Sequence, residues 1–143
     1  MTTLPILLLA GLLQLAPVVT FAPAPNATTI VHIDGPVVTL ATTTPAGTHR
    51  QAIPFDSERP LHVVVDDYDF DGHPDVAVWH IDDSMGVHMV YRIFVFVARR
   101  GEFVELTPAC GDEFLNVQRL AKRKALQNSY FKDNLVVACF HRY

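Results

Sequence analysis

The chain has 143 residues, the length of one ordinary domain, and half of them are apolar, so it can bury a core of its own. Charged residues make up 18% of the chain and the formal net charge is −4, which argues against nucleic acid as a main partner. The charges are unevenly placed. Seven Asp and no Lys or Arg lie between Asp66 and Asp83, whereas six Lys or Arg and one Asp lie between Arg119 and Arg142.

The N-terminal segment is strongly apolar. Between Leu4 and Phe21 only Gln14 and Thr20 are polar, and no charged residue precedes Asp34. This pattern is typical of a secretory signal, which we expect over residues 1–22. Without Lys or Arg before the apolar run and with prolines around the cleavage zone, the segment is either cleaved, kept as a membrane anchor, or buried as a strand or helix. The first two alternatives place the domain outside the cytoplasm.

The next segments are predicted as a linker and a β domain. Proline, alanine, asparagine and threonine dominate Phe21 to Thr29, and residues 23–29 are predicted to be an extended linker. The β domain is expected over residues 30–143. Thr42 to Glu58 is expected to be irregular because it contains two prolines and a glycine. Alternating or continuous apolar runs predict strands at Thr29–Ile33, Val37–Ala41, Leu61–Val65, Val76–Trp79, Met89–Ala98 and Glu102–Leu106.

The longest predicted strand, Met89–Ala98, is apolar on both faces and is therefore expected to be central and covered on both sides. Leu115 to Tyr130 allows either a helix or a turn at residues 121–124 followed by a strand from Ala125 to Phe131. We favour the strand, because Lys132 to Asn134 then forms a hairpin loop before a closing strand, Leu135–Phe140. The fold class is mostly β: a single antiparallel β-sandwich or curved-sheet domain of about eight strands.

An acidic loop separates two of these predicted strands. Asp67, Asp69, Asp71 and Asp75 stand at positions 1, 3, 5 and 9 of the loop, with Gly72 at position 6. Four carboxylates this close repel one another, and calcium, which accepts six to eight oxygens in irregular geometry, removes that repulsion. The backbone carbonyl of the residue at position 7, His73, is a further expected ligand.

The flanks of the loop distinguish it from an EF-hand. That motif requires helices on both sides and a Glu at position 12, whereas position 12 here is Val78 and both flanks are strand-like. We therefore predict a calcium-binding β-hairpin loop similar to the loops of integrin-type propellers. The alternative is an acidic surface turn that holds no metal.

The two cysteines, Cys110 and Cys139, are too far apart in the sequence to form a CxxC metal-binding or redox motif. In an oxidising compartment they are expected to form a disulfide bond, and the alternative is two buried free thiols.

The segment from Leu61 to Tyr143 resembles a family of small bacterial cell-envelope proteins. Val65 to Val78 is similar to that family's D-x-N-F-D-G-Y-x-D-L loop, and a glycine, an aromatic-rich strand and a G-x-F motif follow. These correspond to Gly86, Tyr91–Phe96 and Gly101–Phe103. Asp69 stands where the family commonly has Asn, which leaves a ligand in place, and the basic segment after Cys110 is longer than in the family.

The resemblance implies a function. The best-understood members of the family are periplasmic immunity proteins that carry calcium in this loop and neutralise a peptidoglycan-cleaving, lysozyme-like effector of an antibacterial type IV secretion system. Their fold is similar to that of inhibitors of invertebrate-type lysozyme. The resemblance thus predicts a periplasmic, calcium-binding protein whose partner is a cell-wall glycosidase.

An inhibitor of this kind needs a projecting loop that enters a carboxylate-lined cleft. The segment Asp82–His88 is predicted to be that loop: Ser84 and His88 would donate hydrogen bonds, Gly86 would form the tip, and Tyr91 would brace the base or reach the cleft. Bound calcium is expected to hold the base rigid. Alternatively, this is an ordinary polar turn with Tyr91 in the core, or the basic stretch Arg119–Lys124 contacts the partner.

An enzyme is not expected, because the seven histidines form no HExxH motif or close ligand pair and no G-x-S-x-G or Cys/His nucleophile setting occurs. The rival to the inhibitor is a calcium-stabilised structural or adhesion-like envelope module without an enzyme target.

Overall fold

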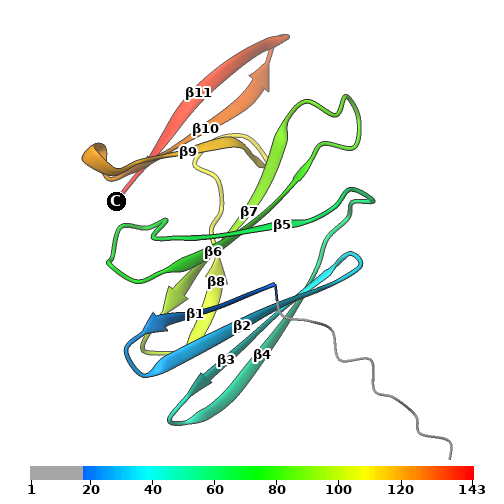
Figure 1. Cartoon of the computed structure of the whole chain (residues 1–143). Helices are drawn as coiled ribbons and strands as arrows, with labels where there is room; N and C mark the ends of the chain where they lie inside the picture. Colours follow the sequence, from blue (N-terminus) through cyan, green and yellow to red (C-terminus); the bar gives the residue numbers. More distant parts are fainter. Residues whose placement is uncertain (1–17) are drawn as a thin grey trace, which may run out of the picture.

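The computed structural model describes residues 18–143, which form two antiparallel β-sheets (Figure 1). Residues 1–17 of the predicted signal or anchor therefore lie outside the described residues, whereas its last residues, 19–22, belong to the first strand of the domain. Over the described range, no helix has the length and apolar character to span a membrane.

The elements are β1 (Val19–Ala24), β2 (Ala27–Asp34), β3 (Val37–Thr44), β4 (Gly47–Pro54), β5 (His62–Asp66), β6 (Asp75–Ile81), β7 (Met89–Val97), β8 (Glu102–Glu105), β9 (Phe114–Leu120), the short 3-10 helix η1 (Ala121–Arg123), β10 (Ala125–Lys132) and β11 (Leu135–Arg142).

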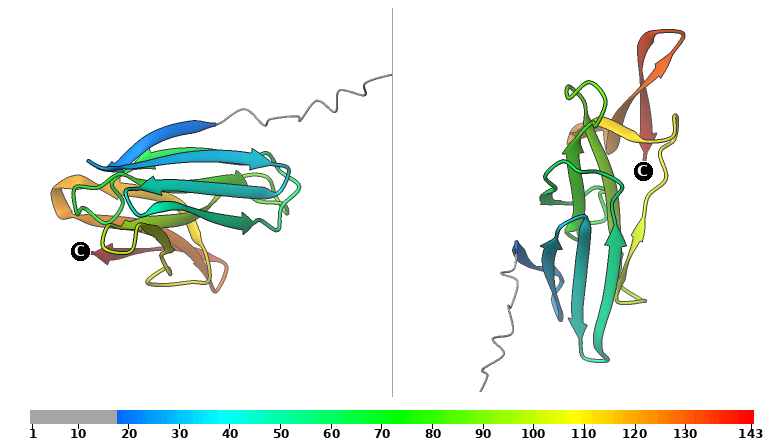
Figure 2. Two further views of the ribbon diagram at one scale, coloured as in Figure 1. Left: turned by 90° about the horizontal axis from the view of Figure 1, so that it is seen from below. Right: turned by 90° about the vertical axis from the view of Figure 1, so that its right-hand side faces the viewer.

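The first sheet is a four-stranded meander in the order β1-β2-β3-β4. The second sheet has the order β11-β10-β9-β7-β6-β5, and β8 pairs with β7 beside β9. Figure 2 shows the meander packed on one part of the second sheet, while the β10–β11 hairpin extends beyond it. The predicted class, a mostly β domain built as a sandwich or curved sheet, is confirmed, with more strands than expected.

Strand β7 has a covered surface on each face, as its two apolar faces predict. Phe94 and Phe96 belong to the core between the two sheets, together with Val31, Val38 and Leu40 of the meander. The opposite face of β7 contributes to a second core inside the curl of the larger sheet. Its fully buried or nearly buried members are Tyr68, Ala77, Ile93, Phe114 and Leu126. The acidic loop begins beside this second core, because Tyr68 belongs to both.

Two predictions about the first sheet are wrong. Residues 23–29, predicted as a linker, contain the end of β1, a turn and the beginning of β2. The predicted irregular segment Thr42–Glu58 contains the end of β3 and all of β4. Both β1 and β4 are outer strands. An outer strand forms backbone hydrogen bonds to a neighbouring strand on one side only, so it tolerates prolines and polar side chains. The apolar periodicity that marks a strand is therefore weak there.

The favoured version of the C-terminal segment is confirmed. Ala125–Lys132 and Leu135–Arg142 form a hairpin with regular register from Ala125 opposite Arg142 to Lys132 opposite Leu135. The two turn residues, Asp133 and Asn134, have φ values of 50° and 62°. Positive φ at both positions is the requirement of a type I′ turn, which Asp and Asn tolerate. The helical alternative survives only as the single turn η1.

Candidate functional site

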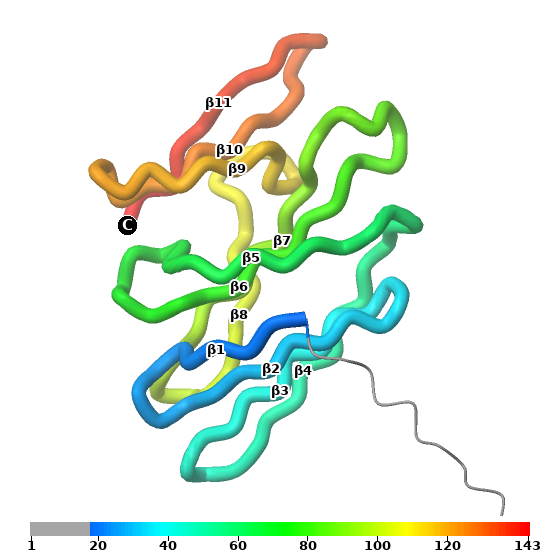
Figure 3. The backbone as a smooth tube through the Cα atoms, viewed as in Figure 1, coloured from blue at the N-terminus to red at the C-terminus, as the bar shows by residue number. Residues whose placement is uncertain are grey.

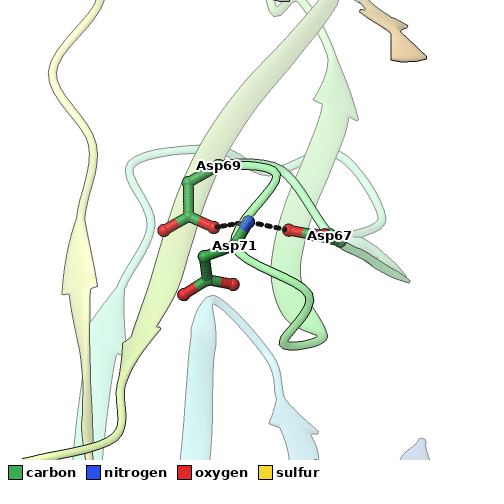
Figure 4. A group of neighbouring side chains, drawn as sticks. All are labelled: Asp67, Asp69 and Asp71. Carbon is green, nitrogen blue, oxygen red and sulfur yellow. Dashed lines mark hydrogen bonds between the residues drawn. The ribbon is translucent and has the colours of Figure 1, made fainter. Parts of the chain in front are cut away.

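Three carboxylates of the predicted calcium loop lie together in the β5–β6 connection. One oxygen each from Asp67, Asp69 and Asp71 lies within 4.8 Å of the others. Figure 4 shows the carboxylates of Asp67 and Asp69 on either side of the backbone N–H of Asp71, to which both are hydrogen bonded. Asp67 and Asp69 are half-buried and Asp71 is exposed. This cluster could hold a metal ion, since hard divalent cations prefer carboxylate oxygens.

The loop is folded by bonds between its own side chains and backbone. The second oxygen of Asp67 accepts from the N–H of Gly72 at 2.9 Å, and Asp71 accepts from the N–H of His73 at 2.8 Å. Gly72 has a φ of 87°, where a side chain is disfavoured. Such short-range Asp-to-backbone bonds are typical of tight turns. The alternating aspartates therefore accept backbone hydrogen bonds within the turn and are also available to a cation.

Asp75 lies under the loop. It is fully buried and directly opposite Asp66 in the β5–β6 pair. One of its oxygens accepts from the N–H groups of Tyr68 (2.8 Å) and Asp69 (3.4 Å), and the other accepts from Phe96 of β7 (2.8 Å). Both oxygens are thus occupied by backbone donors. The structure brings Asp67, Asp69 and Asp71 together and makes Asp75 an anchor of the loop.

The electrostatics of the loop favour a cation. Burial, followed by the charge of Asp75 and the side chain of Asp71, raises the pKa of Asp69 to about 7. Burial also raises the pKa of Asp75 to about 6, against the opposing effect of the backbone donors. A raised carboxyl pKa means that the ionised form is disfavoured. A divalent cation in the cluster would supply the missing positive charge.

Residues from distant strands hold the loop in place. Arg119 of β9 donates to the carbonyl oxygen of Asp67, and its guanidinium lies 4.5 Å from the centre of the Phe70 ring. Phe70 has a φ of 61°, an unfavourable conformation for a bulky residue. The Phe70 ring also packs against Tyr143, with the ring centres 5.8 Å apart. Packing from β9 and the chain end thus fixes a conformation that Phe70 would not adopt by itself.

The loop also contacts the first sheet. His73 was predicted to contribute its backbone carbonyl, and its side-chain Nδ1 lies 2.9 Å from the carbonyl oxygen of Pro23 in β1. The acidic loop therefore touches an outer strand of one sheet through His73 and β9 of the other sheet through Arg119. The basic turn that follows Arg119 carries exposed Lys122, Arg123 and Lys124. This basic stretch and the acidic loop are neighbours.

The predicted insertion loop, residues 82–88, is organised by one aspartate. The first oxygen of Asp82 accepts from the N–H groups of Met85 and Gly86 and from the Ser84 hydroxyl, and the second accepts from the N–H groups of Val87 and His88. These backbone bonds, led by that from His88, lower the pKa of Asp82. The sequence signal for this role of Asp82, which was missed, is an Asp placed before a glycine-containing turn.

The four residues predicted to contact a partner differ in accessibility. Ser84 and Gly86 are exposed, and Gly86 has a φ of 70° at the tip. His88 is half-buried, with its ring packed on Phe131 at 4.9 Å between centres and its Nδ1 3.2 Å from the Asn116 amide nitrogen. Tyr91 is half-buried and packs on the second core. The loop also exposes two apolar side chains that sequence reasoning missed, Met85 and Val87.

The prediction that bound calcium holds the base of this loop rigid is wrong, because the two loops are far apart. The acidic loop precedes β6 and residues 82–88 follow it, so the two loops lie at opposite ends of a strand of seven residues. At about 3.3 Å per residue they are roughly 20 Å apart. Residues 82–88 are held instead by the hydrogen bonds of Asp82 and by Asp83, which accepts from the Ser57 hydroxyl at 3.1 Å.

The predicted disulfide bond between Cys110 and Cys139 is present. It joins the loop before β9 to β11. Buried Asn128 of β10 reinforces this connection, because its amide donates to the carbonyl oxygens of Cys110 and Glu113 and accepts from the N–H of Leu115. A structural disulfide is typical of proteins from oxidising compartments.

No protein-family model, curated protein or solved structure matches this chain. The family resemblance therefore stays a prediction from the sequence.

Proposed function

We propose that this is an extracytoplasmic calcium-binding protein that blocks a peptidoglycan-cleaving, lysozyme-like enzyme. The observation that carries the calcium assignment is the convergence of Asp67, Asp69 and Asp71 within 4.8 Å. The loop offers hard oxygen ligands on an irregular backbone turn, and calcium accepts such a set more readily than magnesium, which demands near-ideal octahedral geometry. The disulfide bond and the apolar N-terminal segment support an oxidising compartment such as the periplasm.

The inhibitory role rests on the loop of residues 82–88. A protein inhibitor loses less conformational entropy on binding when its contact loop is already ordered. The carboxylate of Asp82 holds this loop through four backbone N–H groups, while Ser84 and Met85 remain exposed. A rigid base with a small polar and apolar tip suits insertion into an enzyme cleft. Calcium at the distant acidic loop would act on the stability of the domain.

One observation favours the alternative, a calcium-stabilised structural module. The acidic loop contacts β1 through His73 and β9 through Arg119, so a cation there would strengthen the junction between the two sheets. This contribution requires no enzyme target. The two proposals agree on calcium and differ only in whether residues 82–88 contact a partner.

An inhibition titration separates the two proposals. We expect the purified protein to abolish peptidoglycan hydrolysis at about one equivalent of a lysozyme-like enzyme, tested with a panel of lysozyme classes and any secreted hydrolase encoded beside its gene. Replacing Ser84→Ala with Met85→Ala should weaken inhibition roughly 30-fold, the effect of losing a contact worth about 2 kcal/mol. Val64→Ala, an exposed apolar site outside the loop, is the matched control and should inhibit normally.

Two results would count against the inhibitor. If the parent inhibits no enzyme of the panel, the structural module is the better account. If the folded double variant inhibits as well as the parent, residues 82–88 are not the contact surface, and the Arg119–Lys124 stretch is the next surface to test.

A further inference from the structure

The outer edge of β11 has no strand beside it among the described residues. The strand stands at the end of the larger sheet and pairs with β10 alone, and Figure 3 shows it at the border of the molecule. In an antiparallel hairpin, opposite residues that are hydrogen bonded to each other alternate with opposite residues that are not. This alternation starts at the two-residue turn formed by Asp133 and Asn134. The N–H and C=O groups of Val136, Ala138 and Phe140 therefore point away from β10, toward this open edge.

The other outer strands of the two sheets carry features that prevent edge pairing. β1 contains Pro23 and a register irregularity, and β5 has only five residues, with Pro60 shortly before it and the acidic loop behind it. β4 is bridged to β8, because the Gln51 amide donates to the carbonyl oxygen of Phe103 and accepts from its N–H. Short length, prolines, bulges and covering contacts are the usual protections of sheet edges.

β11 lacks every one of these protections. Its eight residues contain no proline or glycine, its register with β10 is unbroken, and no Asp, Glu, Lys or Arg occurs before its last residue, Arg142. It also presents an apolar face. Val136 is 62% exposed, Phe140 is 41% exposed, and Phe131, opposite Val136 on β10, is 50% exposed. An edge of this length, with apolar side chains beside it, is a template for another strand.

We propose that β11 pairs antiparallel with β11 of a second copy of this chain, which joins the two larger sheets into one. The sequence of the strand is complementary to itself in the register centred on Ala138. In that register Val136 lies opposite Phe140 of the second copy, a favourable pair of β-branched and aromatic side chains. The Ala138 pair and the two Val136–Phe140 pairs together supply about six backbone hydrogen bonds.

The charges of the hairpin fit the same register. Arg142 lies opposite Asn134 of the second copy and beside its Asp133, so each end of the paired strands brings a cation near a carboxylate. The two Arg142 side chains lie at opposite ends of the paired strands and do not repel each other. The proposal uses neither the calcium loop nor residues 82–88 and is independent of the proposed function.

Sedimentation velocity over a concentration series tests the proposal. We expect the purified protein to shift from the mass of one chain to twice that mass as its concentration rises through the micromolar range. Ala138→Lys should weaken this association at least tenfold, because two lysines would meet at the centre of the interface. Ala52→Lys is the matched control: Ala52 is also an exposed alanine on an outer strand, β4, and this variant should associate as the parent does.

Hydrogen exchange gives a second readout that does not depend on the variant. The amides of Val136, Ala138 and Phe140 should exchange more slowly at high protein concentration than at low concentration. A parent that stays monomeric at all concentrations would overturn the proposal. A dimer that Ala138→Lys leaves unchanged, without slowed exchange at these amides, would equally overturn it, because the contact would then lie elsewhere.

Discussion

Asp75→Ala is expected to lower the free energy of unfolding by about 3–5 kcal/mol, because the buried N–H groups of Tyr68 and Phe96 lose a charged acceptor. A typical domain has a total stability of roughly 5–15 kcal/mol, so this single change removes a large share of it. Denaturant unfolding followed by circular dichroism measures the difference. The loss should be present with calcium and with chelator alike, since the bonds of Asp75 are to the backbone.

Asp66 provides the control, because it is paired directly with Asp75 across the two strands yet is exposed. Its ion pair with Arg119, at 3.5 Å, lies near the surface. Asp66→Ala should therefore cost no more than about 1 kcal/mol. If both variants lost the same free energy of unfolding, the burial of Asp75 would not be the reason for its contribution to stability.

Removing the disulfide bond has the second largest expected effect. The bond closes a loop between residues 29 positions apart. In the chain-entropy model, Cys110→Ser with Cys139→Ser then lowers the free energy of unfolding by about 3–4 kcal/mol. Hydrogen exchange should increase most in β11 and in the loop before β9, which the bond joins directly. The measurement is again denaturant unfolding, with the exchange pattern as a second readout.

Reduction of the parent protein is the matched control for the serine variant. Parent protein in reducing buffer should unfold at the same denaturant concentration as Cys110→Ser with Cys139→Ser in either buffer. Thiol labelling of the denatured, unreduced parent should find almost no free thiols. A serine variant as stable as the oxidised parent would contradict the stabilising role of the bond.

The features of the site that could be predicted from the sequence are those that depend on neighbouring residues. The alternating aspartates with Gly72 identify the acidic loop because a turn and its ligands form within a few residues of chain. The same locality allowed the hairpin at Asp133 and Asn134 to be predicted. The structure confirms that Asp67, Asp69 and Asp71 converge.

The remaining features depend on residues far apart in the sequence. Asp75 is buried in part by β7, where it accepts a hydrogen bond from the N–H of Phe96, 21 residues away. The contact of His73 with Pro23 spans 50 residues, and it requires β1, which the sequence did not identify as a strand. The surroundings of His88 also depend on distant residues, because its neighbours Asn116 and Phe131 come from later strands. Spacing alone contains no information about such contacts.

The response of the melting temperature to calcium tests the calcium site most directly. A cation that binds only the folded protein stabilises it by about 2.7 kcal/mol at a hundred times its dissociation constant. We therefore expect calcium to raise the melting temperature of the parent by several degrees and chelator to reverse the rise. Asp69→Ala with Asp71→Ala should melt at the same temperature in both buffers, whereas Asp66→Ala should keep the response. A parent whose melting curve is identical in calcium and in chelator would contradict the account.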